Sequence, residues 1–310
     1  MEFKKKTTIL SGILVALGLV YVLGQVLSPE RVGERRDTYA PLDRRSADSV
    51  ARIFLVFPEG RPIELAEEGG SWQMLRDGGR YPVRRERVGD LLDALSGPGL
   101  FPVRASSELA AGRLGLAEDT ATRISLADGN NRLLLDLLAA PDAAGRNLNF
   151  RHFGENEVRS GENRLAAFLR PSPEAWYDLR LFPEEDLVPA EVMRLTVSPP
   201  GPDGEVQVFT RTERSWDLSF VDGAVNSGRV DRYVGDILSG TADGFGEEAE
   251  TAFADAAITI EFADGSRRTL EFGEADAENV RPARVSGRDL VFMLRGWQHE
   301  RLFLDEETFR

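Results

Sequence analysis

The stretch WYDLRLFPEED at residues 176–186 has a counterpart near the end of the chain, WQHERLFLDEE at residues 297–307. The two stretches share Trp, Arg, Leu and Phe in register, and each ends in three consecutive acidic residues. A match of this kind inside one chain indicates a tandem duplication, in which each copy is one structural unit. The sequence therefore predicts two similar domains, and the duplication by itself names no reaction.

Shorter matches extend this repeat towards the N-terminus. The paired motifs are SW at 71–72 and 215–216, ADG at 127–129 and 263–265, and SG at 160–161 and 286–287. Short apolar runs of the kind that form strands precede the Trp of each SW motif. We therefore expect an α+β fold made of two tandem repeats of β-β-α-β-β-α type, with mainly antiparallel sheets and covering helices. The repeats are expected at residues 49–189 and 190–310.

Two segments have the apolar spacing of a helix that covers one face of a sheet. The first is expected to begin at Pro82, and its apolar stripe is Val88, Leu91, Leu92 and Leu95. The second is expected to be capped by Ser227, and its stripe is Val230, Tyr233, Val234, Ile237 and Leu238. Shorter helices are expected over residues 162–169 and 288–294. A hairpin turn is expected at 128–131, followed by a buried strand at 133–138.

The N-terminal segment at residues 7–27 reads TTILSGILVALGLVYVLGQVL and carries no charged side chain. As a helix it spans about 31 Å, which matches the hydrocarbon core of a bilayer. Lys4, Lys5 and Lys6 precede it and favour a cytoplasmic N-terminus. We expect residues 1–6 to be a cytoplasmic tail, Thr7–Leu27 a single transmembrane anchor and 28–48 a tether to the ectodomain. A cleaved signal peptide, with Val22 and Gly24 before the cleavage site, is one alternative. A buried core helix is the other, and it is disfavoured because the span is apolar all round.

Composition excludes several classes of function. The net charge is −14, and an acidic surface repels phosphate backbones, so we expect no nucleic-acid partner. The chain has no cysteine, which excludes disulfides, thiolate metal sites and a cysteine nucleophile. No lysine follows Lys6, so the lysine of a phosphate-binding P-loop is missing. We expect no cofactor.

Three groups of residues are candidates for chemistry, and each has a structural interpretation that we favour. The acidic triplets at 184–186 and 305–307 have the ligand type of a calcium site, but we expect solvated corners beside Arg180 and Arg301. His152 and His299 lie at non-equivalent places in the two repeats, so we expect no metal site. The four tryptophans are expected to anchor the cores, and they are Trp72, Trp176, Trp216 and Trp297.

Two features of the first repeat have no counterpart in the second. Tyr177 follows Trp176, and a Gly-Glu-Asn loop contains Glu155 and Asn156. Together with Arg180 these residues form the candidate interaction patch of the sequence, which is Trp176, Tyr177, Arg180, Glu155 and Asn156. No catalytic residue is singled out, and we expect a protein that is not an enzyme. A glycan- or peptide-binding module with a concave aromatic patch near Trp176 is one alternative. A hydrolase with an unidentified pair of carboxylates of unequal pKa is the other.

Several motifs together resemble one family. They are the basic start with one span, LGL at 114–116 before RISL at 123–126, NFR at 149–151 before Val158, and WYDLR at 176–180. This pattern resembles the domain-of-unknown-function 4340 family of bacteria over most of residues 1–190. The segment 117–120 lacks the proline that is common in the family at this place.

The resemblance implies where the protein works and with what. It implies a single-pass protein of the bacterial inner membrane, with its C-terminal ectodomain in the periplasm or outside. Its implied partners are the permease and ATPase subunits of a gliding-type ABC transporter, and the family has no established catalytic residues. We therefore expect a non-enzymatic accessory subunit of an ABC-type transport complex. The sequence leaves the oligomeric state and the transported substrate open.

Overall fold

The computed structural model describes residues 37–162, 164–183, 187–201, 204–213, 215–246, 253 and 255–310. The anchor expected at 7–27 and the acidic triplet at 184–186 lie outside these residues. Within these ranges no helix has the length and apolar character that a membrane span requires. The chain divides into two compact units, unit 1 ending at Trp176 and unit 2 spanning Tyr177–Arg310. The division thus precedes Pro189, where the sequence placed the end of the first repeat.

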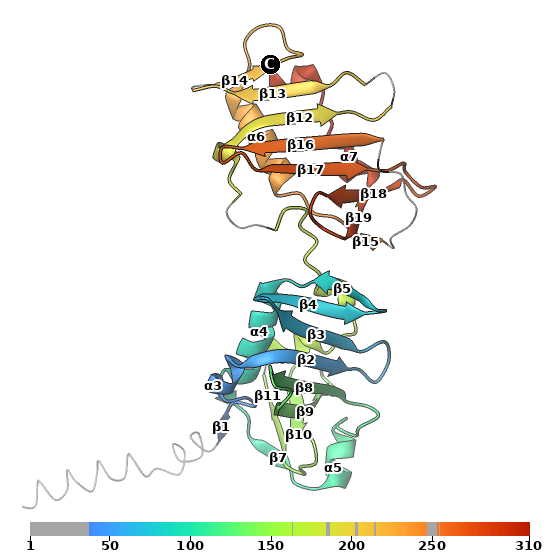
Figure 1. The fold of residues 1–310 in the computed structure, drawn as a ribbon. Helices are drawn as coiled ribbons and strands as arrows, with labels where there is room; N and C mark the ends of the chain where they lie inside the picture. Colours follow the sequence, from blue (N-terminus) through green and yellow to red (C-terminus); the bar gives the residue numbers. More distant parts are fainter. Residues whose placement is uncertain are drawn as a thin grey trace, which may run out of the picture. The chain divides into compact units, whose positions relative to one another are not determined.

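Both units are built mainly of antiparallel sheets, as the sequence predicted (Figure 1). In the described part of unit 1, a nine-stranded sheet has the order β5-β4-β3-β2-β8-β9-β10-β11-β7. Its strands are β2 (Val50–Val56), β3 (Ile63–Glu68), β4 (Ser71–Arg76), β5 (Gly79–Pro82), β7 (Val103–Ala105), β8 (Thr122–Asp128), β9 (Leu133–Pro141), β10 (Leu148–His152) and β11 (Val158–Gly161). The hairpin turn and the strand expected at 128–138 are confirmed, because β8 pairs antiparallel with β9 across them.

Unit 2 contains one large sheet. Among its described residues the sheet has eight strands in the order β14-β13-β12-β16-β17-β18-β19-β15. They are β12 (Val192–Ser198), β13 (Gln207–Arg211), β14 (Trp216–Leu218), β15 (Gly244–Gly246), β16 (Ala256–Phe262), β17 (Arg267–Phe272), β18 (Val280–Val285) and β19 (Val291–Arg295). Buried and half-buried residues alternate strictly along β16, which is the pattern of a strand with one face on the core.

One long helix covers a face of each sheet, and both helices were predicted. Helix α4 (Arg85–Ser96) buries three of the four expected stripe residues, and α6 (Ser227–Leu238) buries all five. Figure 1 shows α6 behind the strands of the second sheet. The two helices begin at other residues than the sequence predicted. Pro82 ends β5, and Asn226 rather than Ser227 caps α6 by accepting a hydrogen bond from the backbone N–H of Arg229 at 3.3 Å.

The prediction of a helix at 288–294 is wrong, because residues 291–295 form strand β19. Phe292 and Leu294 are buried on the core face of this strand, and β18 pairs along its length. The short helix α7 (Gly296–Glu300) begins only where the strand ends. The apolar residues of this segment fit both periodicities, and in so short a run the pairing with β18 decides the outcome.

The second half of the expected tether is part of unit 1. Strand β1 (Thr38–Tyr39) pairs with β6 (Gly99–Leu100), and α3 (Arg44–Ala47) is capped by the side chain of Asp43. Leu42 is 1% exposed, and its backbone N–H donates to the carbonyl of Leu95 at 3.0 Å. The burial of Leu42 and this hydrogen bond hold the segment on α4, and residues 28–36 of the expected tether lie outside the described residues.

The two matching stretches that open the repeat do not occupy matching places. Residues 176–186 begin at the last residue of unit 1 and continue into unit 2, whereas Trp297 lies in α7 of unit 2. In its hydrogen bonding, Trp176 corresponds instead to Phe309, because each of the two accepts a bond from the residue that caps the large helix of its unit. The carbonyl of Trp176 accepts from the backbone N–H of Arg84, which caps α4, and the carbonyl of Phe309 accepts from Asn226, which caps α6, each at 2.9 Å.

The SW and ADG motifs do fall at matching places in the two sheets. SW lies at the start of β4 and of β14, where Ser215 directly precedes the strand, and ADG lies at the end of β8 and directly after β16. The SG motifs do not match, because 160–161 lie in β11 and 286–287 lie between β18 and β19.

Candidate functional site

The motifs that carry the family resemblance meet in a buried structural clamp in unit 1. Arg151 on β10 is 4% exposed, and its guanidinium donates to the carbonyl of Leu116 at 3.0 and 3.2 Å and to the carbonyl of Glu155 at 2.9 Å. It also forms a two-bond ion pair with Glu108, at 2.6 and 2.8 Å. The side chain of Asn149 donates to the carbonyl of Leu114 at 3.2 Å. Neighbouring residues of β10 therefore fix the turn at 114–116.

A glycine makes this turn possible. Gly115 has φ +78°, a left-handed conformation that residues with a side chain rarely adopt. Helix α5 (Glu108–Arg113) ends just before it, and Leu116 is fully buried in the small cluster beneath. The quoted LGL and NFR motifs are thus a turn and the strand that holds it, and both have a structural role.

A larger depression lies elsewhere in unit 1, between α4 and the 3-10 helix η1 (Arg164–Phe168). We call it the α4 groove. It encloses about 620 Å³, in the size range of small-ligand sites. The rings of Phe101 and Phe168 are among its lining and are almost wholly buried. Gly99 and Gly161 leave room for the Phe101 ring, because an added Cβ atom would lie 2.6 or 2.7 Å from it.

Arg87 is the unusual residue of the α4 groove. The centre of its guanidinium lies 4.9 Å from the ring of Phe168 and 4.9 Å from the ring of Trp176. Its Nε atom is buried and has no hydrogen-bond partner among the described residues. Burial, and then the neighbouring charge of Arg84, lower the pKa of Arg87 below its ordinary value, and the charge of Asp90 opposes them with a smaller effect. A cation that is stacked on two rings and forms no direct ion pair with a described residue is a site where an anionic group of a ligand gains energy.

Charges of both signs surround this arginine. Arg164, Asp90, Asp93 and Glu162 also line the α4 groove, and all four side chains are exposed. Among the described residues none of them forms an ion pair, and neither does Arg87. The α4 groove therefore presents two cations and three carboxylates that form no direct ion pair with a described residue, around an aromatic floor.

The aromatic half of the predicted interaction patch is not available to a partner. Trp176 is 1% exposed, packs 5.7 Å from Phe168 and is covered by Arg87. Tyr177 is 8% exposed and meets Phe245 edge to face, with ring centres 5.1 Å apart. The favoured expectation for Trp176, a core anchor, therefore holds, and the alternative of an aromatic patch near Trp176 and Tyr177 finds no exposed ring at these two residues.

The polar members of that patch are not brought together with Trp176. Arg180 binds Asp178 at 2.6 and 2.8 Å. Burial alone raises the pKa of Asp178, but the hydrogen bonds and charge of Arg180, with a smaller effect of Arg288, lower its pKa below the usual value. Glu155 and Asn156 are exposed in the loop after β10, where the carbonyl of Glu155 accepts from Arg151. No sequence signal pointed to Arg87, since a lone arginine on a helix has no recognisable spacing.

The other candidate residues have local structural partners. His299 is 5% exposed, its ring lies 5.0 Å from Phe272 and 4.6 Å from Phe303, and burial is the main cause that lowers its pKa to about 4. The Nε2 atom of His152 lies 2.6 Å from the hydroxyl of Tyr39. In the second triplet Asp305 accepts from Thr308. Within the described ranges no group of side chains has the arrangement of a metal site.

Three tryptophans anchor the units as expected, and Trp297 does not. Trp72, Trp176 and Trp216 are at most 9% exposed, whereas Trp297 is 56% exposed. Trp297 lines a smaller depression of about 180 Å³ in unit 2, together with Gln298 of α7 and with residues at the end of α6.

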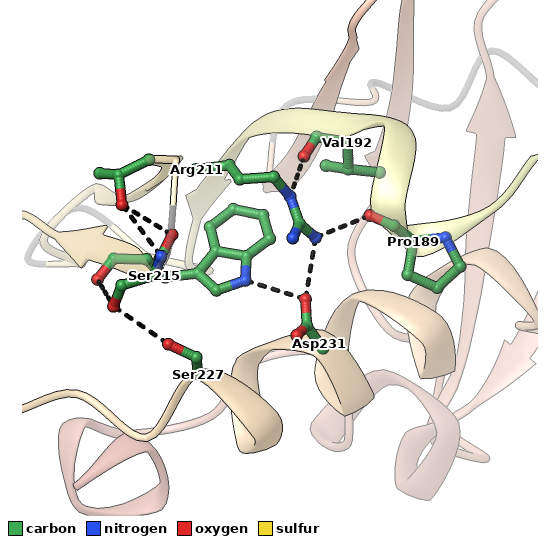
Figure 2. A network of polar contacts seen from close by, with 8 residues as sticks. Pro189, Val192, Arg211, Ser215, Ser227 and Asp231 are labelled. Carbon is green, nitrogen blue, oxygen red and sulfur yellow. Dashed lines mark hydrogen bonds and ion pairs between the residues drawn. The ribbon is translucent and has the colours of Figure 1, made fainter.

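Trp216 belongs to a polar network that fastens α6 to its sheet (Figure 2). Its indole N–H donates to Asp231 at 3.0 Å, and Arg211 donates to the same oxygen at 2.8 Å. Arg211 also donates to the carbonyls of Pro189 and Val192 at 2.8 Å and lies 4.3 Å above the ring of Trp216. All these bonds join neighbouring elements of unit 2, so the network has a structural role.

Comparisons of the chain with protein-family models, with curated proteins and with solved structures find no match. The functional argument therefore rests on the sequence patterns and on the geometry described above.

Proposed function

We propose that the chain is a membrane-anchored envelope protein that acts without catalysis, as an accessory subunit of an ABC-type, gliding-related transport complex. The proposal is supported by the uncharged segment at 7–27 behind three lysines and by the resemblance of residues 1–190 to the family named above. The implied partners are the permease and ATPase subunits, and the implied location is the outer side of a bacterial inner membrane.

One observation of the fold carries the proposal furthest. The carbonyl of Asp37, the first described residue, accepts a hydrogen bond from the backbone N–H of Phe101 at 2.7 Å. With an anchor at 7–27, at most residues 28–36 separate the bilayer from unit 1, and nine residues span at most about 30 Å. A unit held this close to the bilayer is placed to contact the extracytoplasmic parts of a permease.

The tandem repeat is part of the same proposal. Its support is the strand order, because the sequence β4-β3-β2-β8-β9-β10-β11-β7 of the first sheet has the same connectivity as the whole second sheet. Each large helix, α4 or α6, follows the strand that carries the SW motif, with β5 intervening in unit 1. We infer a duplicated unit in which β5 is an addition to the first copy.

Affinity purification in mild detergent tests the accessory role. The full-length chain should copurify with the permease and ATPase subunits of one transporter. A variant with residues 1–27 replaced by a cleavable signal peptide should be secreted, folded and free of these subunits. The proposal would be contradicted if both the full-length chain and the secreted variant recovered only soluble proteins and no transporter subunit.

A second candidate function is a peptide-binding module of the envelope, and the α4 groove is the specific observation that favours it. Its volume suits a short ligand, and its unpaired charges and aromatic floor are binding features. No single observation among the described residues favours the hydrolase alternative in the same way.

A further inference from the structure

We infer that the α4 groove binds a short peptide that carries both a free carboxylate and a cationic group, with an apolar side chain between them. The inference does not depend on the transporter role, because it rests on the described residues of unit 1 alone. It names a ligand class for a site that the sequence patterns did not mark.

The carboxylate is assigned to Arg87. Its guanidinium is stacked on Phe168 and Trp176, and this stacking fixes the plane of the group before a ligand arrives. Preorganisation lowers the entropic cost of binding, and the fork of a guanidinium matches a carboxylate through two parallel hydrogen bonds. Asp90 acts on Arg87 through its charge, but no described carboxylate forms a direct ion pair with Arg87, so a ligand carboxylate displaces no such pair.

The cationic group is assigned to the acidic side of the groove. Asp90 and Asp93 lie on α4, and Glu162 lies on the opposite wall just after β11. A ligand with negative charge alone meets three carboxylates, and a ligand with positive charge alone meets Arg87 and Arg164. Only a ligand with both charges complements the two halves, and such complementarity determines specificity more than affinity.

The apolar part of the ligand is assigned to the floor. Phe101 and Phe168 are held rigidly, since Phe101 meets Phe150 edge to face at 5.0 Å and Phe168 packs on Trp176. A volume of about 620 Å³ is larger than a single amino acid needs and suits a peptide of a few residues. A peptide therefore fits the groove better than a free amino acid or a simple anion.

The test is a calorimetric titration of the full-length chain in detergent with six tripeptides. Each contains lysine, leucine and aspartate with free termini, and the six cover every order. We expect at least one to bind with a Kd below about 1 mM, and its form without a carboxylate, with asparagine for aspartate and an amidated C-terminus, to bind at least tenfold more weakly. Failure of all six to bind at millimolar concentration would overturn the inference.

Variants locate the site. Arg87→Met keeps an unbranched stem over the two rings and removes the charge, and it should weaken binding at least tenfold. Arg164→Gln changes an exposed residue, so it tests the same groove without risk to the fold, and it should weaken binding at least threefold. Arg85→Met removes an exposed arginine of the same helix that does not line the groove, and it should leave the Kd unchanged. Equal Kd values for all three variants would place the ligand elsewhere and refute the assignment. Copurification with transporter subunits is measured separately, so failure of one proposal is distinguishable from failure of the other.

Discussion

The strongest structural prediction concerns Arg151, because one side chain holds three segments of unit 1 together. In Arg151→Met the stem volume is largely kept while all five donated hydrogen bonds are lost. The ion pair with Glu108 contributes little, because the Glu108 side chain is 65% exposed and exposed pairs are worth at most about 1 kcal/mol. The larger cost lies in the carbonyls of Leu116 and Glu155. A buried acceptor left without its donor costs about 1–3 kcal/mol, so we expect a total loss of about 3 kcal/mol.

Urea unfolding of the full-length chain measures this loss, and hydrogen exchange places it. The backbone N–H of Leu116, which donates to the carbonyl of Ala111 at 3.0 Å, should exchange faster in the variant, while the amides of unit 2 keep their rates. Glu108→Gln is the matched control and should cost at most about 1 kcal/mol. A loss below about 1 kcal/mol in Arg151→Met, with unchanged exchange at Leu116, would refute the clamp.

Three further predictions concern single residues. The pKa of His299 is about 4 in the fold against 6.5 without perturbation, so protonation favours the unfolded chain as the pH falls from about 6.5 to 4. At about 1.4 kcal/mol per pKa unit, burial of His299 should cost the fold about 3 kcal/mol of unfolding free energy between pH 7 and pH 4, and His299→Phe should remove this loss. Urea unfolding at the two pH values measures it, and an equal loss in the variant and the wild type would count against the prediction. Asp231→Ala should cost about 1–2 kcal/mol and raise the exchange rate of the α6 amides, because Arg211 and Trp216 lose their shared acceptor; unchanged exchange would mean that the network does not hold α6. Gly115→Ala should cost about 1–2 kcal/mol in thermal unfolding because of its positive φ, and an unchanged melting temperature would show that the turn relaxes freely.

Much of the sheet-rich architecture was predictable, because it depends on local pattern. Helices α4 and α6 follow from apolar stripes at helical spacing, and the β8–β9 hairpin follows from its turn residues. The segment 291–295 was misread because its five residues suit a helix or a strand, and the choice is made by pairing with β18, which sequence spacing does not reveal. The fold of residues 38–48 was missed for a similar reason, since Leu42 gains its burial only from the distant helix α4.

The candidate site was less predictable than the fold. The sequence placed Trp176 both among the core anchors and in the candidate interaction patch, and long-range packing against Phe168 and Arg87 leaves it only the first role. Arg87 itself was invisible, because its character comes from two rings that lie far away in the sequence and from the absence of a direct ion pair with a described residue. The repeat was found from motifs that coincide in letters, yet the hydrogen bonds to the helix caps relate Trp176 to Phe309 rather than to Trp297. Two short stretches with the same residue types can therefore lie at different positions in the two copies of a repeat.

The most direct measurement is crosslinking of the full-length protein in native membranes, followed by purification and mass spectrometry of its partners and of its own N-terminus. The account predicts an intact N-terminal peptide containing Lys4 to Lys6, and crosslinks from unit 1 to the permease of an ABC transporter. A chain that begins near Gln25 and carries no crosslink to a membrane protein would contradict it.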